Sequence, residues 1–146
     1  AGSIPVLSDL YTLFDSVEMA TAFTISDSID VRSWRAVAVY CDYTWNVNGR
    51  LQFIGEISPD NVNWYSAVVI DSAITQDNTL GTGSVFGSRN LYGGSVFITP
   101  APAGAAAASF KIAWDVEEDF FFRMRAADEL QVGTANSLTA RARLAR

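Results

Sequence analysis

The strongest constraint on this chain is a two-residue alternation of apolar and polar side chains, repeated in short runs from residue 34 onward. In the last run, for example, Leu138 and Ala140 alternate with Thr139 and Arg141. Successive side chains of a β-strand point to opposite faces, so this pattern predicts strands that each bury one face. The runs cover residues 34–43, 50–57, 63–70, 95–99, 109–114, 120–125 and 138–144, and glycine, asparagine, aspartate or proline separates most of them.

The first three runs predict three consecutive antiparallel strands. Residues 34–43 are apolar on both alternations, which is typical of a central strand covered on both faces. Residues 46–49 end in Asn-Gly, a dipeptide that tolerates the positive φ angles of a hairpin turn into residues 50–57. Residues 58–61, Ser-Pro-Asp-Asn, predict a second turn before residues 63–70.

Two other segments connect the later strands. Residues 71–94 are polar and glycine-rich, which predicts one long surface loop that contains at most a short strand at residues 84–86. The acidic residues 115–119 predict a turn that reverses the chain. The alanine-rich residues 103–108 have no clear preference, although the nearby prolines and Gly104 favour a loose connection.

The N-terminal segment is ambiguous between helix and strand. Leu7, Leu10, Phe14 and Val17 match the spacing of one helix face. Residues 18–25 contain two threonines, Phe23 and Ile25, and this composition favours strands. We therefore expect strands here.

Together these patterns predict an all-β fold. A chain of 146 residues with about eight strands and almost no helix is satisfied by two packed antiparallel sheets, a jelly-roll-like β-sandwich. We expect a single domain, in which residues 1–24 form an N-terminal arm with the first strands and residues 25–146 form the sandwich body.

Composition excludes several function classes. The chain has no histidine, which removes Ser-His-Asp and Cys-His triads, histidine-ligated zinc and imidazole acid-base catalysis. Its single cysteine, Cys41, lies in an apolar run and is expected to be a buried structural thiol. A net charge of −6 disfavours nucleic acid as a partner, and no apolar run is long enough to span a membrane. We therefore expect a protein that is not an enzyme.

The acidic turn is the carboxylate cluster of this sequence that is best suited to chemistry. Asp115, Glu117, Glu118 and Asp119 would suit a calcium ion, but their spacing lacks the alternate ligands and the glycine of a calcium loop. A pair of them would suit a glycosidase. On a short exposed turn, carboxylates more simply stay ionised and keep the sheet end soluble. We expect no catalytic residue, no metal and no cofactor.

Two surface features suggest binding. Arg123 and Arg125 occupy the polar positions of one strand, and Arg141 and Arg143 those of another; if the strands are neighbours, the four form a basic stripe for an acidic partner, unless acidic residues on the same sheet neutralise it. Aromatic residues at strand ends and loops could stack on sugar rings and form a glycan site. The glycan candidates are Trp45, Trp64, Tyr65 and Tyr92, whereas core filling accounts for Trp34, Phe53, Trp114 and residues 120–122.

Some of these residues also carry a family resemblance. Residues 28–34 lead into a long apolar strand, residues 58–65 form a turn followed by tryptophan, and Phe122-Arg123-Met124-Arg125 is an aromatic-Arg-x-Arg pattern. This arrangement resembles the small β-sandwich proteins of tailed-phage structural modules. In size and layout the chain is similar to the head decoration, or cement, proteins, whose jelly-roll domains sit as trimers on the capsid and clamp neighbouring major capsid subunits. In this chain Asn61 stands where glycine is usual, and Pro59 is an added constraint.

The resemblance implies a non-enzymatic virion protein on the outer surface of the capsid, a homotrimer that binds the major capsid protein and stabilises the head. The same sandwich also serves in tail fibres, so a carbohydrate- or receptor-binding module is the alternative, and a hydrolase is a distant third. Two segments are our candidate partner contacts, with ordinary edge packing as the competing interpretation. Their residues are Ile4, Pro5, Val6 and Leu7 near the N-terminus, and Leu80, Val85, Phe86, Leu91 and Tyr92 in the predicted loop.

Overall fold

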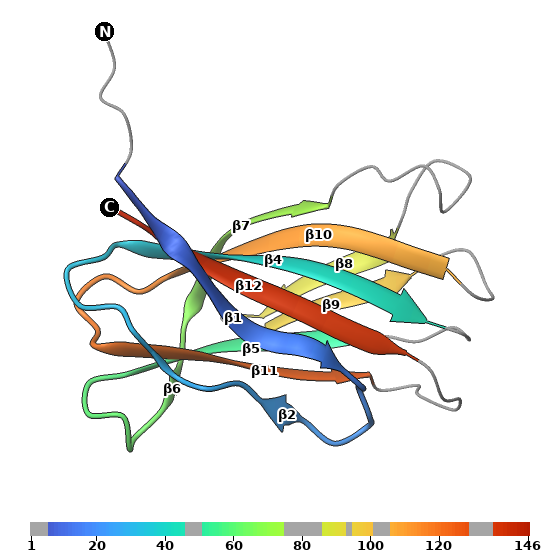
Figure 1. Cartoon of the computed structure of the whole chain (residues 1–146), viewed down its shortest axis with the longest axis horizontal. Helices are drawn as coiled ribbons and strands as arrows, with labels where there is room; N and C mark the ends of the chain where they lie inside the picture. The colour runs from blue at the N-terminus through green and yellow to red at the C-terminus, as the bar shows by residue number, and fades with distance from the viewer. Residues whose placement is uncertain (1–5, 46–50, 75–85, 93–94, 101–105, 129–135) are drawn as a thin grey trace, which may run out of the picture.

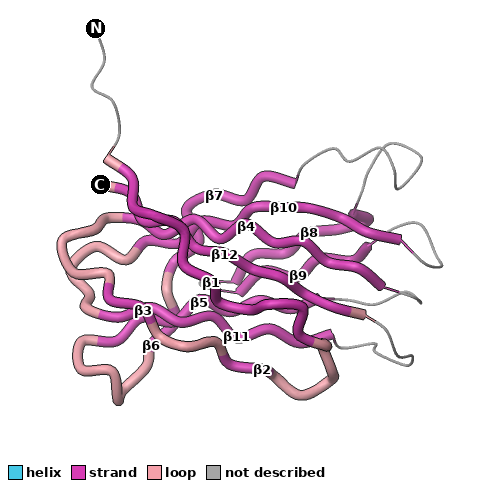
Figure 2. Tube along the Cα trace, viewed as in Figure 1, coloured by secondary structure: helices cyan, strands magenta, loops and turns pink. Residues whose placement is uncertain are grey.

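The computed structural model describes residues 6–45, 51–74, 86–92, 95–100, 106–128 and 136–146, with the side chains of residues 45 and 71–108 excepted. These residues form β-strands, turns and loops without any helix (Figure 2). They therefore contain no helix with the length and apolar character needed to cross a membrane. The strands build two antiparallel sheets that pack face to face, so the predicted all-β sandwich is confirmed.

The two sheets, which we call sheet A and sheet B, are seen one behind the other in Figure 1. Sheet A has the order β1 (Leu7–Val17), β12 (Ser137–Ala145), β4 (Ala36–Trp45), β10 (Ala106–Asp115) and β7 (Val68–Ile74). Sheet B has the order β2 (Thr24–Ile25), β11 (Phe121–Asp128), β5 (Leu51–Ser58), β9 (Ser95–Pro100) and β8 (Phe86–Tyr92). Two further short strands complete sheet B: β3 (Ile29–Asp30) pairs with β11, and β6 (Tyr65–Ser66) pairs with β5.

The strand pairing has the form of one long antiparallel ribbon that is rolled up. The strands of the first half pair with those of the second half in reverse order: β1 with β12, β2 with β11, β4 with β10, and β5 with β9. These eight strands divide four and four between the sheets, as in a jelly roll. The described residues form four further strands beyond these eight: β3, β6, β7 and β8.

The prediction of three consecutive antiparallel strands is wrong for the first pair and right for the second, because β5 pairs with β6 antiparallel across the turn at residues 58–61. The strand at residues 34–43 becomes β4 in sheet A, whereas the next strand becomes β5 in sheet B, so they are not hairpin partners. The third predicted strand divides into β6 in sheet B and β7 in sheet A, with the buried Ala67 at the crossing. Residues 46–50, which contain the expected Asn-Gly turn, lie outside the described residues. Alternation shows which side of a strand is buried, but it does not identify the neighbouring strand.

Strand β4 is central, as predicted, because it lies between β12 and β10. Its inward residues Val37, Val39 and Tyr43 have no exposed surface. Its outward face is open, however, and Tyr40 is 42% exposed, so the expected cover on both faces is wrong. The apolar outward residues of β4 are partly shielded by neighbouring strands of the same sheet rather than by a second layer.

The segment at residues 71–94 is not one continuous loop. Residues 71–74 belong to β7 and residues 86–92 form β8, which pairs with β9. Residues 75–85 and 93–94 lie outside the described residues. A short strand was expected at residues 84–86; the described strand β8 begins at Phe86, the last of these residues, and continues to Tyr92.

The N-terminal segment is a strand, which confirms the favoured interpretation. Pairing of β1 with β12 shows register shifts between Leu7 and Leu10, between Thr12 and Phe14, and between Phe14 and Val17. Such bulges change the direction of successive side chains, and the adjacent Leu13 and Phe14 are both buried. Of the four residues that match a helix face, only Phe14 is buried, so their spacing does not mark one buried side of the strand.

The turn at residues 58–61 is formed as predicted, and Asp60 organises it. Its Oδ1 accepts hydrogen bonds from the backbone N–H of Val62 at 2.9 Å and of Asn63 at 2.8 Å. These backbone bonds, together with one from the Asn63 amide, hold the pKa of Asp60 well below its ordinary value. Asn61 adopts a left-handed φ of 62°, the conformation that glycine would otherwise supply.

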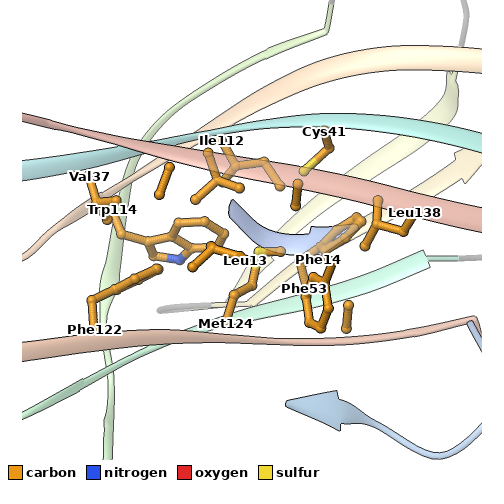
Figure 3. Close-up of a cluster of buried hydrophobic side chains, with 14 of the residues drawn as sticks. Leu13, Phe14, Val37, Cys41, Phe53, Ile112, Trp114, Phe122, Met124 and Leu138 are labelled. Carbon is orange, nitrogen blue, oxygen red and sulfur yellow. The ribbon is translucent and has the colours of Figure 1, made fainter. Parts of the chain in front are cut away.

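The core fills the space between the sheets (Figure 3). Trp114 of β10 is fully buried and points from sheet A toward sheet B, where its ring centroid lies 5.6 Å from that of Phe122. It rests on the backbone of Gly55 in β5, since a Cβ at that position would be 2.6 Å from the indole atoms Nε1 and Cε2. Glycine at residue 55 is therefore what makes room for the tryptophan. Phe120, which we expected to face inward, is 47% exposed instead.

A buried polar contact also joins the sheets. The hydroxyl of Tyr43 on β4 donates to Oδ2 of Asp128 on β11 at 2.6 Å, and both residues are almost fully buried. Burial, followed by the neighbouring Asp128 carboxylate, raises the pKa of the Tyr43 hydroxyl far above its ordinary value. The hydroxyl thus stays protonated as the donor of this bond.

Replacing Gly55→Ala is expected to lower the free energy of unfolding by about 1–3 kcal/mol, because the added methyl group overpacks the Trp114 site. Urea denaturation measures the change, with the outward-facing Gln52→Ala on the same strand as control. In the Gly55→Ala background, Trp114→Phe should cost less than it does in the parent protein. Strictly additive effects would contradict direct packing between the two residues.

The buried thiol of Cys41 should make the folded protein less stable at alkaline pH. Burial raises its pKa well above the ordinary value, with a smaller contribution from Asp42. Above about pH 8.5 the unfolded chain releases the thiol proton while the folded chain keeps it, so the free energy of unfolding should fall by about 1.4 kcal/mol per pH unit. Urea titrations between about pH 8 and pH 10 under reducing conditions should show this slope, and Cys41→Ala should remove it. Equal slopes in the two proteins would refute the assignment.

Candidate binding surfaces

The free edge of sheet A presents an apolar surface. Strand β1 pairs with β12 on one side, and no described strand pairs with its other side. Four large apolar residues within six positions of this segment are exposed: Val6 by 51%, Leu7 by 51%, Leu10 by 48% and Tyr11 by 42%. We call this group the β1 edge. An edge strand that carries apolar side chains beside unpaired backbone groups is suited to pairing with another chain.

The bulges anchor the β1 edge to the last strand. The backbone N–H of Leu144 donates to the Ser8 hydroxyl at 2.8 Å, in place of a regular ladder bond. The backbone N–H of Arg146 donates to the carbonyl of Val6 at 3.1 Å. The edge is thus held in place by β12, and its apolar side chains remain at the surface.

The predicted four-arginine stripe does not exist. Arg123 and Arg125 lie on β11 in sheet B, whereas Arg141 and Arg143 lie on β12 in sheet A, so the two pairs face opposite sides of the sandwich. The stripe required β11 and β12 to be neighbours, and they are not, because the rolled ribbon places them in different sheets.

The arginine pair on sheet B shares one carboxylate of its own sheet. Glu56 on β5 accepts from Arg123 Nε at 2.9 Å, and its other oxygen lies 3.7 Å from Arg125 Nη1. An aromatic ring lies under each guanidinium: the Arg123 Cζ is 4.2 Å from the Trp64 centroid, and the Arg125 Cζ is 4.6 Å from that of Phe23. This network closes the outward face of sheet B, as the competing interpretation of the stripe proposed.

This network also changes the glycan hypothesis. Trp64 is half-buried, and the Arg123 guanidinium occupies a ring face that a sugar would need. Tyr65 is 60% exposed and remains a free aromatic surface. The backbones of Trp45 and Tyr92 belong to β4 and β8, but their side chains lie outside those described.

The arginine pair on sheet A is open. Arg141 and Arg143 make no ion pair with any described residue. Lys111 makes none either; it lies on β10, the strand on the other side of β4. We call Lys111, Arg141 and Arg143 the basic face of sheet A. Tyr40 lies between them in the register, opposite Lys111 on one side and Arg141 on the other.

One end of the sandwich has a hollow of about 600 Å³, which sequence reasoning missed. Its charged groups engage partners within the chain: Arg32 pairs with Asp30, and Arg35 Nε lies 4.0 Å from Glu117 Oε2. The Arg146 guanidinium lies 4.9 Å from the Trp34 ring centroid and covers a face of the indole. Only the density of charged and aromatic residues at 30–35 hinted at this feature.

The acidic turn contributes carboxylates to the same hollow without gathering them into a metal site. Glu117, Glu118 and Asp119 line it, and Glu118 has a left-handed φ of 72°. Burial raises the pKa of Asp119 above its ordinary value, followed by the charges of Asp115 and Glu118. Among the described residues, no three acidic or cysteine side chains lie together in a way that would hold a metal ion.

The candidate partner contacts divide into three groups. Val6 and Leu7 are described and exposed. Phe86, Leu91 and Tyr92 lie on β8, whose backbone pairs with β9 at the edge of sheet B, and their side chains are outside those described. Ile4, Pro5, Leu80 and Val85 lie outside the described residues.

The two arginine pairs should respond differently to mutation. Glu56→Gln leaves two partly buried guanidinium groups without their carboxylate and should lower the free energy of unfolding by about 1–3 kcal/mol. Arg141→Gln, on the open face, should change it by no more than about 0.5 kcal/mol. Urea denaturation of both variants tests this difference, and an unchanged Glu56→Gln protein would disprove the structural role of the network.

Comparisons with known proteins add one likeness. No protein-family model matches the sequence, and no curated protein matches it either. The structure is similar to the crystal structure of the SPBc2 prophage-derived protein YomS, with a TM-score of 0.53 and 12% sequence identity. The match covers 100% of this chain and 98% of that chain. At this level of identity, the likeness shows that the two chains share a fold over their whole length.

Proposed function

We propose that this protein is a non-enzymatic structural protein of a phage particle, which decorates the head by binding across major capsid protein subunits. The observation that carries the proposal is the β1 edge, where Val6, Leu7, Leu10 and Tyr11 expose apolar surface on a strand with a free side. A surface of this kind serves adhesion: apolar side chains supply burial, and the strand's backbone groups supply hydrogen bonds.

The fold supports the same class of function. A rolled antiparallel ribbon is a rigid scaffold that presents its edges and outer faces to partners. The neighbour in fold is described as prophage-derived, which agrees with the phage resemblance of the sequence. In this proposal the virion is the location and the outer surface of the capsid is the binding site.

A trimer would strengthen a weak contact. The described β1 edge offers only a few apolar side chains, so a single copy would bind weakly. When three copies are joined, binding of the first raises the effective concentration of the other two at the capsid surface. We therefore propose a homotrimer as the form that binds.

Particles induced from the strain that encodes the chain test the proposal. Mass spectrometry and immunogold electron microscopy should find the protein on the heads of purified particles. The double variant Leu7→Ser/Leu10→Ser should lose binding to heads that lack the protein, while its melting temperature stays close to that of the parent, because both side chains are exposed. Val62→Ser is the matched control, since Val62 is 74% exposed on the turn between β5 and β6 and lies away from the β1 edge.

Light scattering on the same samples measures the oligomer. We expect a mass three times the 15.8 kDa of one chain. Antibody labelling confined to tail fibres, together with retention on a glycan column that Tyr65→Ala abolishes, would instead support the receptor-binding alternative. Absence of the protein from every particle fraction would overturn both.

A further inference from the structure

The two outer faces of the sandwich carry the same arginine motif in different states. On each face two arginines alternate along one strand, Arg123 and Arg125 on β11 and Arg141 and Arg143 on β12. The first pair shares Glu56 and lies over two aromatic rings. The second pair makes no ion pair and no cation–π contact with any described residue. The first pair thus contacts a carboxylate and two rings of its own sheet, although Arg125 Nε has no hydrogen-bond partner, whereas the second pair makes neither kind of contact with a described residue.

The open pair borders a hollow of about 240 Å³ on the outer face of sheet A. Besides the two arginines, Leu10, Tyr40 and Asp42 line this hollow. The strand register explains this grouping, because β12 lies between β4 and β1. Arg141 on β12 is opposite Tyr40 on β4, and Arg143 on β12 is opposite Leu10 on β1. Arg143 Nε is shielded from solvent and has no hydrogen-bond partner, so part of its donor capacity is unused.

The charges around this hollow do not balance. Arg141 and Arg143 line it with two positive charges, and Asp42 supplies one negative charge whose Oδ1 accepts from the Ser109 hydroxyl at 2.5 Å. Lys111 is not part of the lining, but it lies opposite Tyr40 in the register and adds a third positive charge to this face. The chain as a whole has a net charge of −6, so this patch opposes the sign of the molecule. Guanidinium groups bind carboxylates through two parallel hydrogen bonds, which suits Asp and Glu side chains.

We propose that the basic face of sheet A binds an extended acidic segment of a partner protein, with carboxylates on Arg141 and Arg143 and apolar side chains on Tyr40 and Leu10. Leu10 belongs both to the hollow and to the β1 edge, so a segment that pairs with the free side of β1 lies beside the basic face. A nucleic acid fits less well, because Asp42 and the net charge of −6 repel a long polyanion. The inference goes beyond the proposed function, because binding at this face depends on an acidic segment in the partner and does not depend on the partner being a capsid protein.

Fluorescence anisotropy with the full-length protein tests the proposal. The probe is a labelled peptide in which glutamate alternates with apolar residues, and the reference peptide has glutamine in place of glutamate. We expect saturable binding of the acidic peptide that weakens as salt is raised, and little binding of the reference peptide. A labelled single-stranded oligonucleotide and a sulfated polysaccharide are measured under the same conditions.

Three variants assign the binding to the basic face. Arg141→Gln and Arg143→Gln should each weaken the affinity for the acidic peptide about tenfold, which corresponds to about 1.4 kcal/mol. Arg35→Gln removes the same charge from an exposed arginine at the end of the sandwich and should leave the affinity within about twofold. Lys111→Gln should have an intermediate effect. Circular dichroism shows whether each variant keeps the strand content of the parent protein.

Several results would overturn the proposal. These are no binding of the acidic peptide, equal binding of the glutamine peptide, or an equal loss in Arg35→Gln, which would indicate a general charge effect. Tighter binding of the oligonucleotide or polysaccharide, lost in the same variants, would assign the face to a different class of polyanion. Because the peptide assay contains no phage particle, its failure leaves the proposed decoration function standing, and the reverse also holds.

Discussion

The fold depends on the packing of Trp114 from sheet A against the backbone of Gly55 in sheet B. The paired strands of the rolled ribbon lie far apart in the chain; β1 pairs with β12, and β4 pairs with β10. Such pairs gain little stability alone, because isolated pairs of strands are marginal in water. Stacking of the sheets buries the large side chains that stabilise every pair at once. A tryptophan that fits only where its partner strand lacks a side chain also aligns the two sheets, and the Tyr43–Asp128 hydrogen bond adds a second alignment.

The outer faces then acquire different characters from similar sequences. On sheet B, Glu56 lies beside both arginines of β11 and forms an ion pair with each. On sheet A, the arginines of β12 lie beside Tyr40, Ala38 and Leu10, and their charges stay open. The free β1 edge belongs to the same sheet as the open charges. The face of sheet A thus combines arginines without ion pairs to described residues and a free strand edge, and this combination is what the proposed binding role uses.

Local features were predictable, whereas only one strand pairing was, that of β5 with β6 across the Asp60 turn. The alternations at residues 109–114 and 138–144 correctly identify Phe110, Trp114 and Leu138 as core residues, and the Asp60 turn forms as its sequence indicates. The hairpin between residues 34–43 and 50–57 was wrong because alternation is a property of one strand. Of the candidate contact residues, Val6 and Leu7 are exposed, whereas the grouping of Arg143 with Tyr40 and Leu10 had no signal in any single segment.

By itself, the sequence determined that the chain forms strands, which side of most strands is buried, and that imidazole chemistry is absent, because these properties follow from residue types and their two-residue spacing. Only the tertiary structure decided which strands are neighbours, and with them which arginines meet a carboxylate. The physical reason is that a strand's ladder bonds are backbone groups common to all residues, so the choice of partner depends on how large side chains such as Trp114 pack between the sheets. The different surroundings of the two arginine pairs therefore follow from the strand order, which places β11 beside β5 and β12 between β1 and β4.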